Sequence, residues 1–404
     1  MSLAPWIFDE KGQAWPNSLK RFAMSGLLVP ESTSIAVKVP LKTGSTAGQS
    51  NPILLEGPQD AISELVALVG DHGIRQIGTG TISSAGVAVT GTNTFFTREL
   101  QVGDTIVVSG QTATVATITS DTALTTSLAF APALSSNAFA YLTPANTDVE
   151  NRLGVVITDM AYQRELMNNW VPALHVFGDY QKQEWIKQTI LLERNQTLKL
   201  RFQNDSTSAR AGFVFGSQVG KWQAEALNEP DVLRFVREMK RHRVLCQPYW
   251  LTLDNQKVTL TASSAGIGFL TNTKDMLLIL FNVYGHMYSA GAAGNITEGF
   301  SVKLTEQRTG RVLMSQPLVR TQICGTAQEP FRLPCPLFMD PQNQLRADFT
   351  NLVTDASTEV WMTLHGVGVY LKQSGLTDKD VMAEARRIWQ ASQQVTAIPA
   401  GSIG

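Results

Sequence analysis

The stretch from Gln342 to Asn351, QNQLRADFTN, contains the pattern that decides the fold of this chain. Its apolar residues alternate with polar ones up to Phe349, which is the two-residue period of a β-strand with one buried face. The stretch from Asn195 to Asn204, NQTLKLRFQN, has the same Gln/Asn turn, the same alternation and the same Phe-x-Asn ending. We therefore predict two related β-sandwiches, with chance similarity of short strand-turn patterns as the alternative.

Residues 261–372 around the first stretch are rich in β-branched and apolar runs separated by turns. This spacing predicts an antiparallel β-sandwich, plausibly a jelly roll. The expected fold class is mainly β and multi-domain, with antiparallel β-sandwich or jelly-roll domains, an inserted small β-barrel module and a few helices. The strands predicted in this region are Met276–Val283, Phe300–Thr305, Val312–Met314, Leu345–Phe349 and Val360–Tyr370.

Residues 76–143 differ sharply in composition from their neighbours, because threonine is abundant and charges are rare. Short β-branched runs alternate with turns such as Gly103-Asp104 and Ser120-Asp121, which predicts a small Thr-rich β module. Residues 144–260 are predicted to form a mixed β-sandwich plus a helix over 230–243. That helix begins after Glu229 with Pro230 and Asp231, a favoured helix start.

The two ends of the chain contain few apolar residues for a core of their own. Residues 1–75 are predicted to be an extended N-terminal arm with one short helix from Pro58 to Val69. Residues 373–404 are predicted to form a C-terminal helix and tail that must dock on this chain or on a neighbour. The aromatic residues of these ends make Trp6, Trp15, Ile388 and Trp389 candidate interface residues.

The chain has 404 residues, of which 43% are hydrophobic and 17% charged, and its net charge is −1. This balance argues against binding nucleic acid by overall charge. The N-terminus lacks the basic and apolar regions of a signal peptide, and the longest apolar run, Met276–Phe281, is too short to span a bilayer. We expect neither a nucleic acid nor a membrane as a partner.

No residue pattern predicts catalysis, a metal site or a cofactor. The five histidines, His72, His175, His242, His286 and His365, lie in unrelated contexts without metal-ligand spacing. The three cysteines, Cys246, Cys324 and Cys335, fit buried free thiols. The basic cluster that contains Arg234, Arg237 and Arg241 could contact phosphate or an acidic partner. Because no aromatic platform or second basic run accompanies it, the solvated face of a helix or a contact for a protein partner is favoured. We therefore expect no enzyme, although paired carboxylates could meet in the fold.

Three passages resemble structural proteins of tailed-bacteriophage virions. Residues 80–124 resemble a small β module of phage tail, neck and capsid-associated proteins. Residues 331–366 are similar to the closing strands of a sandwich in minor virion proteins, and residues 233–250 more faintly resemble a segment of tail-assembly proteins. The resemblance implies a virion component that is assembled in the bacterial host cytoplasm.

The leading functional hypothesis is a non-enzymatic structural protein of a tailed phage, a homo-oligomer at the neck, collar or tail. Its partners would be copies of itself and neighbouring virion proteins: portal, head-tail connector, tail or capsid. One alternative is a capsid decoration or head-fibre protein. A second alternative, from another class, is a carbohydrate-binding receptor protein or depolymerase, which would need aromatic residues and carboxylates that converge in a groove.

Overall fold

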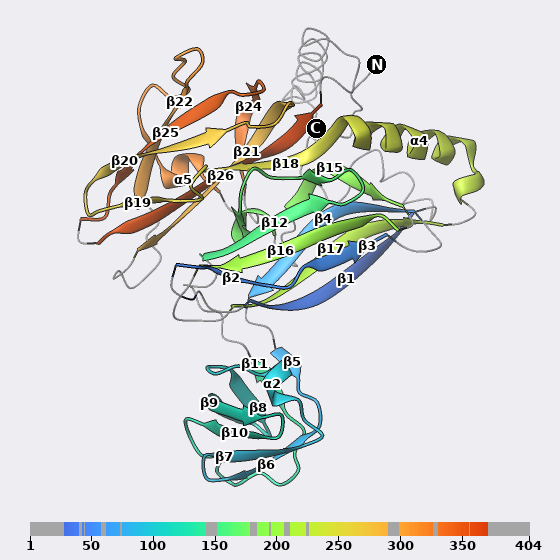
Figure 1. Cartoon of the computed structure of the whole chain (residues 1–404), viewed down its shortest axis with the longest axis vertical. Coiled ribbons are helices and arrows are strands. Elements are labelled where there is room, and N and C mark those ends of the chain that lie inside the picture. Colours follow the sequence, from blue (N-terminus) through green and yellow to red (C-terminus); the bar gives the residue numbers. More distant parts are fainter. Residues whose placement is uncertain are drawn as a thin grey trace, which may run out of the picture.

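The computed structural model of the chain describes residues 28–39, 43, 45–57, 62–72, 75–142, 152–177, 184–193, 195–205, 211–223, 226–289, 299–325, 330–354 and 356–370. Within these residues the protein is mainly β with few helices, and the strands of its sheets pair antiparallel, so the predicted fold class is confirmed. Two sandwiches lie next to each other and a smaller module lies at one end of the molecule (Figure 1).

The first sandwich contains two facing sheets. One sheet has the order β1 (Leu28–Val39), β17 (Ala211–Trp222), β4 (Ser63–His72) and β15 (Glu184–Leu192). The other has the order β13 (Arg164–Glu165), β12 (Leu153–Asp159), β16 (Thr197–Asn204) and β2 (Gly48–Gln49), with β14 (Val171–Pro172) beside β12 and β3 (Ile53–Glu56) beside β16. The chain crosses between the sheets after nearly every strand, which is the connectivity of a jelly roll. We call this unit the first jelly roll.

The second sandwich repeats this arrangement and is called the second jelly roll. One sheet has the order β18 (Cys246–Thr252), β26 (Thr358–Val369), β21 (Leu277–Ser289) and β24 (Phe331–Met339), with β19 (Val258–Leu260) also on β26. The other sheet has the order β20 (Ala265–Thr271), β25 (Gln344–Asn351), β22 (Phe300–Glu306) and β23 (Leu318–Val319). The two quoted stretches of sequence form β16 and β25, which occupy the same place in their sheets.

The strand registers of the two jelly rolls are the same. Strands β12 and β16 pair from Leu153↔Asn204, and strands β22 and β25 pair from Phe300↔Asn351, so both residue numbers differ by 147. The same difference relates the bounds of β17 and β26. Even the β-bulges coincide, because Val66 in β4 and Phe281 in β21 are each skipped by the partner strand. The two sandwiches are therefore structural repeats of one another.

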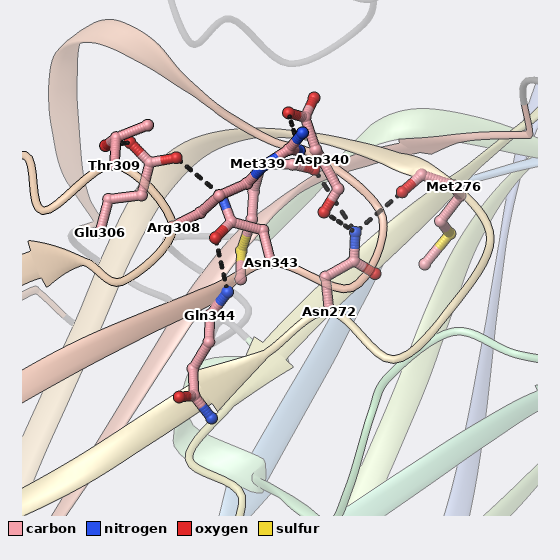
Figure 2. A network of polar contacts seen from close by, with 9 residues as sticks. All are labelled: Asn272, Met276, Glu306, Arg308, Thr309, Met339, Asp340, Asn343 and Gln344. Carbon is pink, nitrogen blue, oxygen red and sulfur yellow. Dashed lines mark hydrogen bonds and ion pairs between the residues drawn. The ribbon is translucent and has the colours of Figure 1, made fainter.

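The turns before β16 and β25 repeat as well. Asn195 and Gln342 adopt left-handed backbone angles, with φ of 62° and 60°. In the second jelly roll the Asn272 side chain ties this turn together by donating to the carbonyls of Met276 and Asp340, at 2.8 and 3.0 Å (Figure 2). Asn343 also donates to the Glu306 carboxylate at 2.7 Å (Figure 2). The Asn272 amide therefore satisfies main-chain carbonyls at the end of the sandwich, and the Asn343 amide satisfies a carboxylate beside them.

The module at one end of the molecule lies between β4 and β12 along the chain. Its seven-stranded sheet has the order β5 (Arg75–Ile77), β11 (Ala140–Leu142), β8 (Thr105–Val108), β9 (Gln111–Ser120), β10 (Ala123–Thr126), β7 (Ala88–Thr92) and β6 (Thr81–Ala85). Helix α2 (Phe96–Glu99) contributes Phe96 to a core that the module does not share with either jelly roll. In the second jelly roll, β21 and β22 are joined by only residues 290–299. The module is thus an insertion into one jelly-roll connection, and we call it the inserted module.

Helix α4 (Pro230–Leu245) connects the two jelly rolls, and the short helix η3 (Ala226–Asn228) precedes it. Val232, Phe235 and Val236 are buried, and the Phe235 ring lies 5.8 Å from the ring of Trp222. Two other short helices, η2 (Ala173–His175) and α5 (Arg320–Ile323), occupy equivalent places in the two jelly rolls. None of the described helices is long and apolar enough to cross a membrane.

The predicted helix from Pro58 to Val69 is wrong, because residues 63–72 form strand β4. The bulge at Val66 explains the misleading pattern. It adds one residue between Leu65 and Leu68, so both side chains face the core although they are three positions apart. A bulged strand therefore produced the spacing that is typical of a helix.

Three other sequence expectations differ from the structure. Residues 28–72 are not an arm, because β1 and β4 are strands of the first jelly roll. The second sandwich begins with β18 at Cys246 rather than at residue 261. The expected strand Val312–Met314 is reduced to a single bridge between Val312 and Thr305. In the first two cases a pairing partner far away in sequence decided the outcome.

Candidate functional site

The two jelly rolls meet at a surface that we call the joint. On the first jelly roll it consists of the segment 164–177, which follows β12. On the second it consists of the outer face of the sheet formed by β18, β26 and β21. The Trp250 amide donates to the Leu166 carbonyl at 3.0 Å, and the Asn168 side chain both donates to the Thr252 carbonyl and accepts from its amide, each at 2.8 Å. The first jelly roll therefore extends the edge of strand β18.

Trp250 anchors the joint. Its side chain is 1% exposed and belongs to the hydrophobic core cluster of the first jelly roll, although β18 is a strand of the second. Trp250 is paired with Met167 in a parallel bridge. The Trp250 ring is stacked on the His365 ring, with 4.3 Å between the ring centroids. Aromatic side chains bury large apolar areas, so this contact fastens a strand of the second jelly roll to the core of the first.

Three histidines converge in the joint. His175 ends η2 in the first jelly roll, whereas His286 and His365 lie on β21 and β26 of the second, and they are 0%, 4% and 0% exposed. His286 Nδ1 lies 2.9 Å from His175 Nε2, and the His286 ring is stacked on the Trp361 ring at 4.9 Å. His365 Nδ1 lies 3.2 Å from the Tyr284 hydroxyl. These three histidines lie in unrelated sequence contexts, so nothing in the sequence indicated that they meet.

The hydrogen bonds around His175 determine which group donates and which accepts in each contact. The Thr252 hydroxyl donates to the Met362 carbonyl at 3.1 Å, and the Thr363 hydroxyl donates to Thr252 at 3.1 Å. Thr363 can therefore only accept from His175 Nδ1, 2.8 Å away. His175 Nε2 then carries no proton in the neutral ring and must accept from the Nδ1–H of His286. With both rings neutral, each bond in this chain has one donor and one acceptor.

Electrostatics agree with a neutral His175. Burial, the neighbouring His286 and the Arg320 guanidinium together lower the pKa of His175 well below its ordinary value of 6.5. Arg320 approaches through its Nε, which donates to the Gly285 carbonyl at 3.1 Å. A proton on His175 would thus be added to a dry site that is already next to a cation.

Ion pairs line one rim of the joint. Lys257 of the second jelly roll lies 2.7 Å from Asp205 of the first and 2.9 Å from Glu359, which also pairs with Arg152 at 3.5 Å. Burial opposes the charge on Lys257, but its hydrogen bonds to the two carboxylates outweigh burial and raise its pKa. A space of about 20 Å³ beside Trp361 is large enough only for water. The rim is therefore a structural contact rather than a ligand pocket.

The sequence-predicted interface residues are not brought together by the described structure. Trp6, Trp15, Ile388 and Trp389 lie outside the described residues, as does the Arg241 side chain, so their role stays a prediction. Arg234 and Arg237 are exposed on α4. Among the cysteines, Cys246 is buried as expected, whereas Cys335 is exposed. No group of three His, Cys, Asp or Glu side chains in the described part could hold a metal ion.

The residues that form the joint were missed by sequence reasoning, because each lies in a strand or turn with no distinctive local motif. The only available signal was the repeat itself. Leu166-Met167 in the joint corresponds to Leu313-Met314 in the second jelly roll, an identical pair in matching positions.

No protein-family model and no curated protein sequence matches the chain. Among solved structures, the chain is similar to one from Sulfolobus turreted icosahedral virus, at 9% identity over 91% of this chain and 98% of that chain, with a TM-score of 0.37. It is also similar to the major capsid protein of faustovirus, at 6% identity over 85% and 90% of the two chains, with a TM-score of 0.25. A third similar structure is the VP2 subviral particle of infectious bursal disease virus, at 8% identity over 89% of this chain and 79% of that chain, with a TM-score of 0.19. TM-scores this low leave the chain's own strand order as the evidence for its fold.

Proposed function

We propose that this chain is a structural subunit of a virus particle, and that copies of it associate side by side through a repetition of the joint. The observation that carries the proposal is the structural repeat. The joint pairs segment 164–177 of the first jelly roll with the sheet of β18, β26 and β21 of the second. Because the two jelly rolls are equivalent, the second also contains a counterpart of that segment, and the first also contains a counterpart of that sheet. Neither counterpart takes part in the joint within one chain.

The first unused half is an edge of the second jelly roll. In the first jelly roll, Leu166 and Met167 are 2% and 1% exposed because the joint covers them. Their counterparts Leu313 and Met314 are only partly buried, and the adjoining Val312 is 47% exposed. Segment 312–322 is thus a second copy of the joint-forming segment with nothing described on top of it.

The second unused half is strand β1, the counterpart of β18. In the described part of the chain, β1 pairs only with β17, so its other edge has no strand beside it. Ser32 occupies the register position of Trp250, since both stand opposite equivalent residues of β17 and β26. Unpaired strand edges readily accept another chain. A contact between two different surfaces can repeat from one copy to the next. Such a series closes into a ring when the rotation between neighbouring copies brings the last copy back to the first.

The jelly roll and the sequence resemblance together favour a virion over other settings. Jelly rolls build viral shells as well as lectin domains, and the resemblance to tailed-phage virion proteins selects the first of these. Lateral repetition suits a capsid shell and equally a ring at the neck, collar or tail. The inserted module lies at the end of the molecule away from α4 (Figure 1), so it would project from such an assembly.

We also propose that the chain has no catalytic activity. Carboxylates at turns are occupied by backbone amides: Asp104 Oδ2 accepts from the Gln101 amide at 2.9 Å, and Asp121 Oδ1 accepts from the Thr97 amide at 3.1 Å. Such bonds are the usual role of Asp in a turn. Release of reducing ends from host glycan by the purified chain, abolished by one Asp→Asn or Glu→Gln change, would contradict this part of the proposal.

The assembly is tested by measuring the mass of the purified chain by analytical ultracentrifugation. We expect an oligomer for the parent, and a monomer for the variant Val312→Asp with Ser315→Asp, because both changes place charge on an exposed edge without touching a core. The matched control is Leu128→Asp, which alters a side chain 68% exposed on the inserted module and should leave the oligomer intact. A monomeric parent, or equal masses for the parent and the double variant, would refute the proposed contact.

A further inference from the structure

We propose that the contact between His175 and His286 makes the joint acid-sensitive. While His175 is neutral, the joint holds the two jelly rolls together, and protonation of His175 opens the joint. The inference concerns the joint within one chain, so it does not depend on the proposed assembly.

An added proton on His175 would place a charge in a buried contact between two imidazole rings. Its Nδ1–H is donated to Thr363 at 2.8 Å, and its Nε2 accepts from His286 at 2.9 Å. A proton on Nε2 would either set its N–H against the Nδ1–H of His286 or force His286 into the opposite tautomer, in which Nε2 carries the proton. Both rings are almost fully buried, so neither water nor a rotation of an exposed side chain can relieve the contact.

None of the described groups that contact His175 carries a negative charge that would compensate the proton. Among the described residues, the groups that face His175 are His286 and Tyr284 on β21 and Arg320 on α5, and His365 on β26 is stacked on Tyr284. The carboxylates of the rim, Asp205 and Glu359, are already paired with Lys257 and Arg152. Because His175 is held neutral in the closed joint, its protonation is coupled to separation of the jelly rolls.

The sign of the pH dependence follows from this coupling. His175 has a lowered pKa in the closed joint and an ordinary value of 6.5 when it is released. The closed joint is therefore fully stable above pH 6.5. Below that value the open form takes up a proton that the closed form does not, so the open fraction rises by about tenfold per pH unit until the pH reaches the lowered pKa.

The native cysteines provide a readout. Cys246 lies on β18 within the joint and is 1% exposed, Cys335 is exposed, and Cys324 packs against the core of the second jelly roll. The full chain is treated with dithiodipyridine, a disulfide reagent that remains reactive in acid, between pH 7.5 and 5.5. The labelling rate of each thiol, resolved by peptide mass spectrometry, is divided by its rate in urea-unfolded protein at the same pH.

We expect the relative rate at Cys246 to rise about tenfold in total between pH 7.5 and pH 5.5, most of it below pH 6.5, while those at Cys335 and Cys324 change less than twofold. The variant His175→Asn keeps a donor near the position of Nδ1 but cannot titrate, so it should abolish the rise at Cys246. A constant rate at Cys246, a parallel rise at Cys324, or an unchanged slope in the variant would each overturn the proposal.

A second measurement covers the case in which the variant does not fold. In the parent chain labelled with ¹⁵N-histidine, we expect the nuclear magnetic resonance signals of His175 to report a neutral ring protonated at Nδ1 at pH 6. Protonation of His175 with a pKa at or above 6.5, or the opposite tautomer, would overturn the proposal by itself.

Discussion

Replacing Trp250 with alanine should weaken the joint more than any change to an exposed side chain. The Trp250 ring is 1% exposed, lies in the core cluster of the first jelly roll and is stacked on His365. A buried tryptophan removes roughly 150–250 Å² from water, and at about 25 cal/mol per Å² this burial contributes about 4–6 kcal/mol. Because the surroundings partly relax around the cavity, we expect Trp250→Ala to lower the free energy of unfolding by about 3–5 kcal/mol.

The assay is equilibrium urea unfolding at pH 7.5, followed by circular dichroism at one fixed protein concentration. Trp250→Phe is the informative companion variant. The indole Nε1 is buried and has no hydrogen-bond partner among the described residues, so phenylalanine loses no hydrogen bond and keeps a ring against His365. We expect that variant to cost about 1 kcal/mol, as a reduction of volume in a packed core does.

Ile267→Ala serves as the control, because Ile267 is 49% exposed and its truncation should change the free energy of unfolding by less than about 0.5 kcal/mol. The reasoning would be refuted if Trp250→Ala lost less than about 1 kcal/mol, or if Trp250→Phe were as destabilising as Trp250→Ala. Either result would mean that the two jelly rolls do not depend on this ring for their association.

Two further predictions concern the inserted module and the sheet of the second jelly roll. Replacing residues 78–142 with a short Gly/Ser linker should leave a cooperative thermal transition, because the equivalent connection between β21 and β22 needs no module; aggregation of the shortened chain would show that the module is integral. Gly366→Ala should destabilise the chain by several kcal/mol, since its Cβ would lie 1.9 Å from the backbone oxygen of Ile279, whereas Gly266→Ala meets side chains alone, Leu260 at 2.4 Å and Val258 at 3.2 Å, and should cost about 1 kcal/mol. Equal melting temperatures for the two glycine variants would contradict this comparison.

The sequence by itself determined the features that depend on neighbouring residues. The alternation of Leu198, Leu200 and Phe202 specified the buried face of β16, and the same period specified β25. Pro230 and Asp231 marked the start of α4. These features were predictable because side-chain direction in a strand and the start of a helix are set within a few residues.

Only the tertiary structure decided which strands pair and which side chains meet. Leu65 and Leu68 have a helical spacing, and only pairing of β4 with β17 turned them into a bulged strand. His175, His286 and His365 come from three strands or turns of two domains, and no local pattern links them. Their contact arises because the edge of β18 accepts the segment after β12, and such long-range pairing depends on the shape of both folded surfaces rather than on the order of residues along either one.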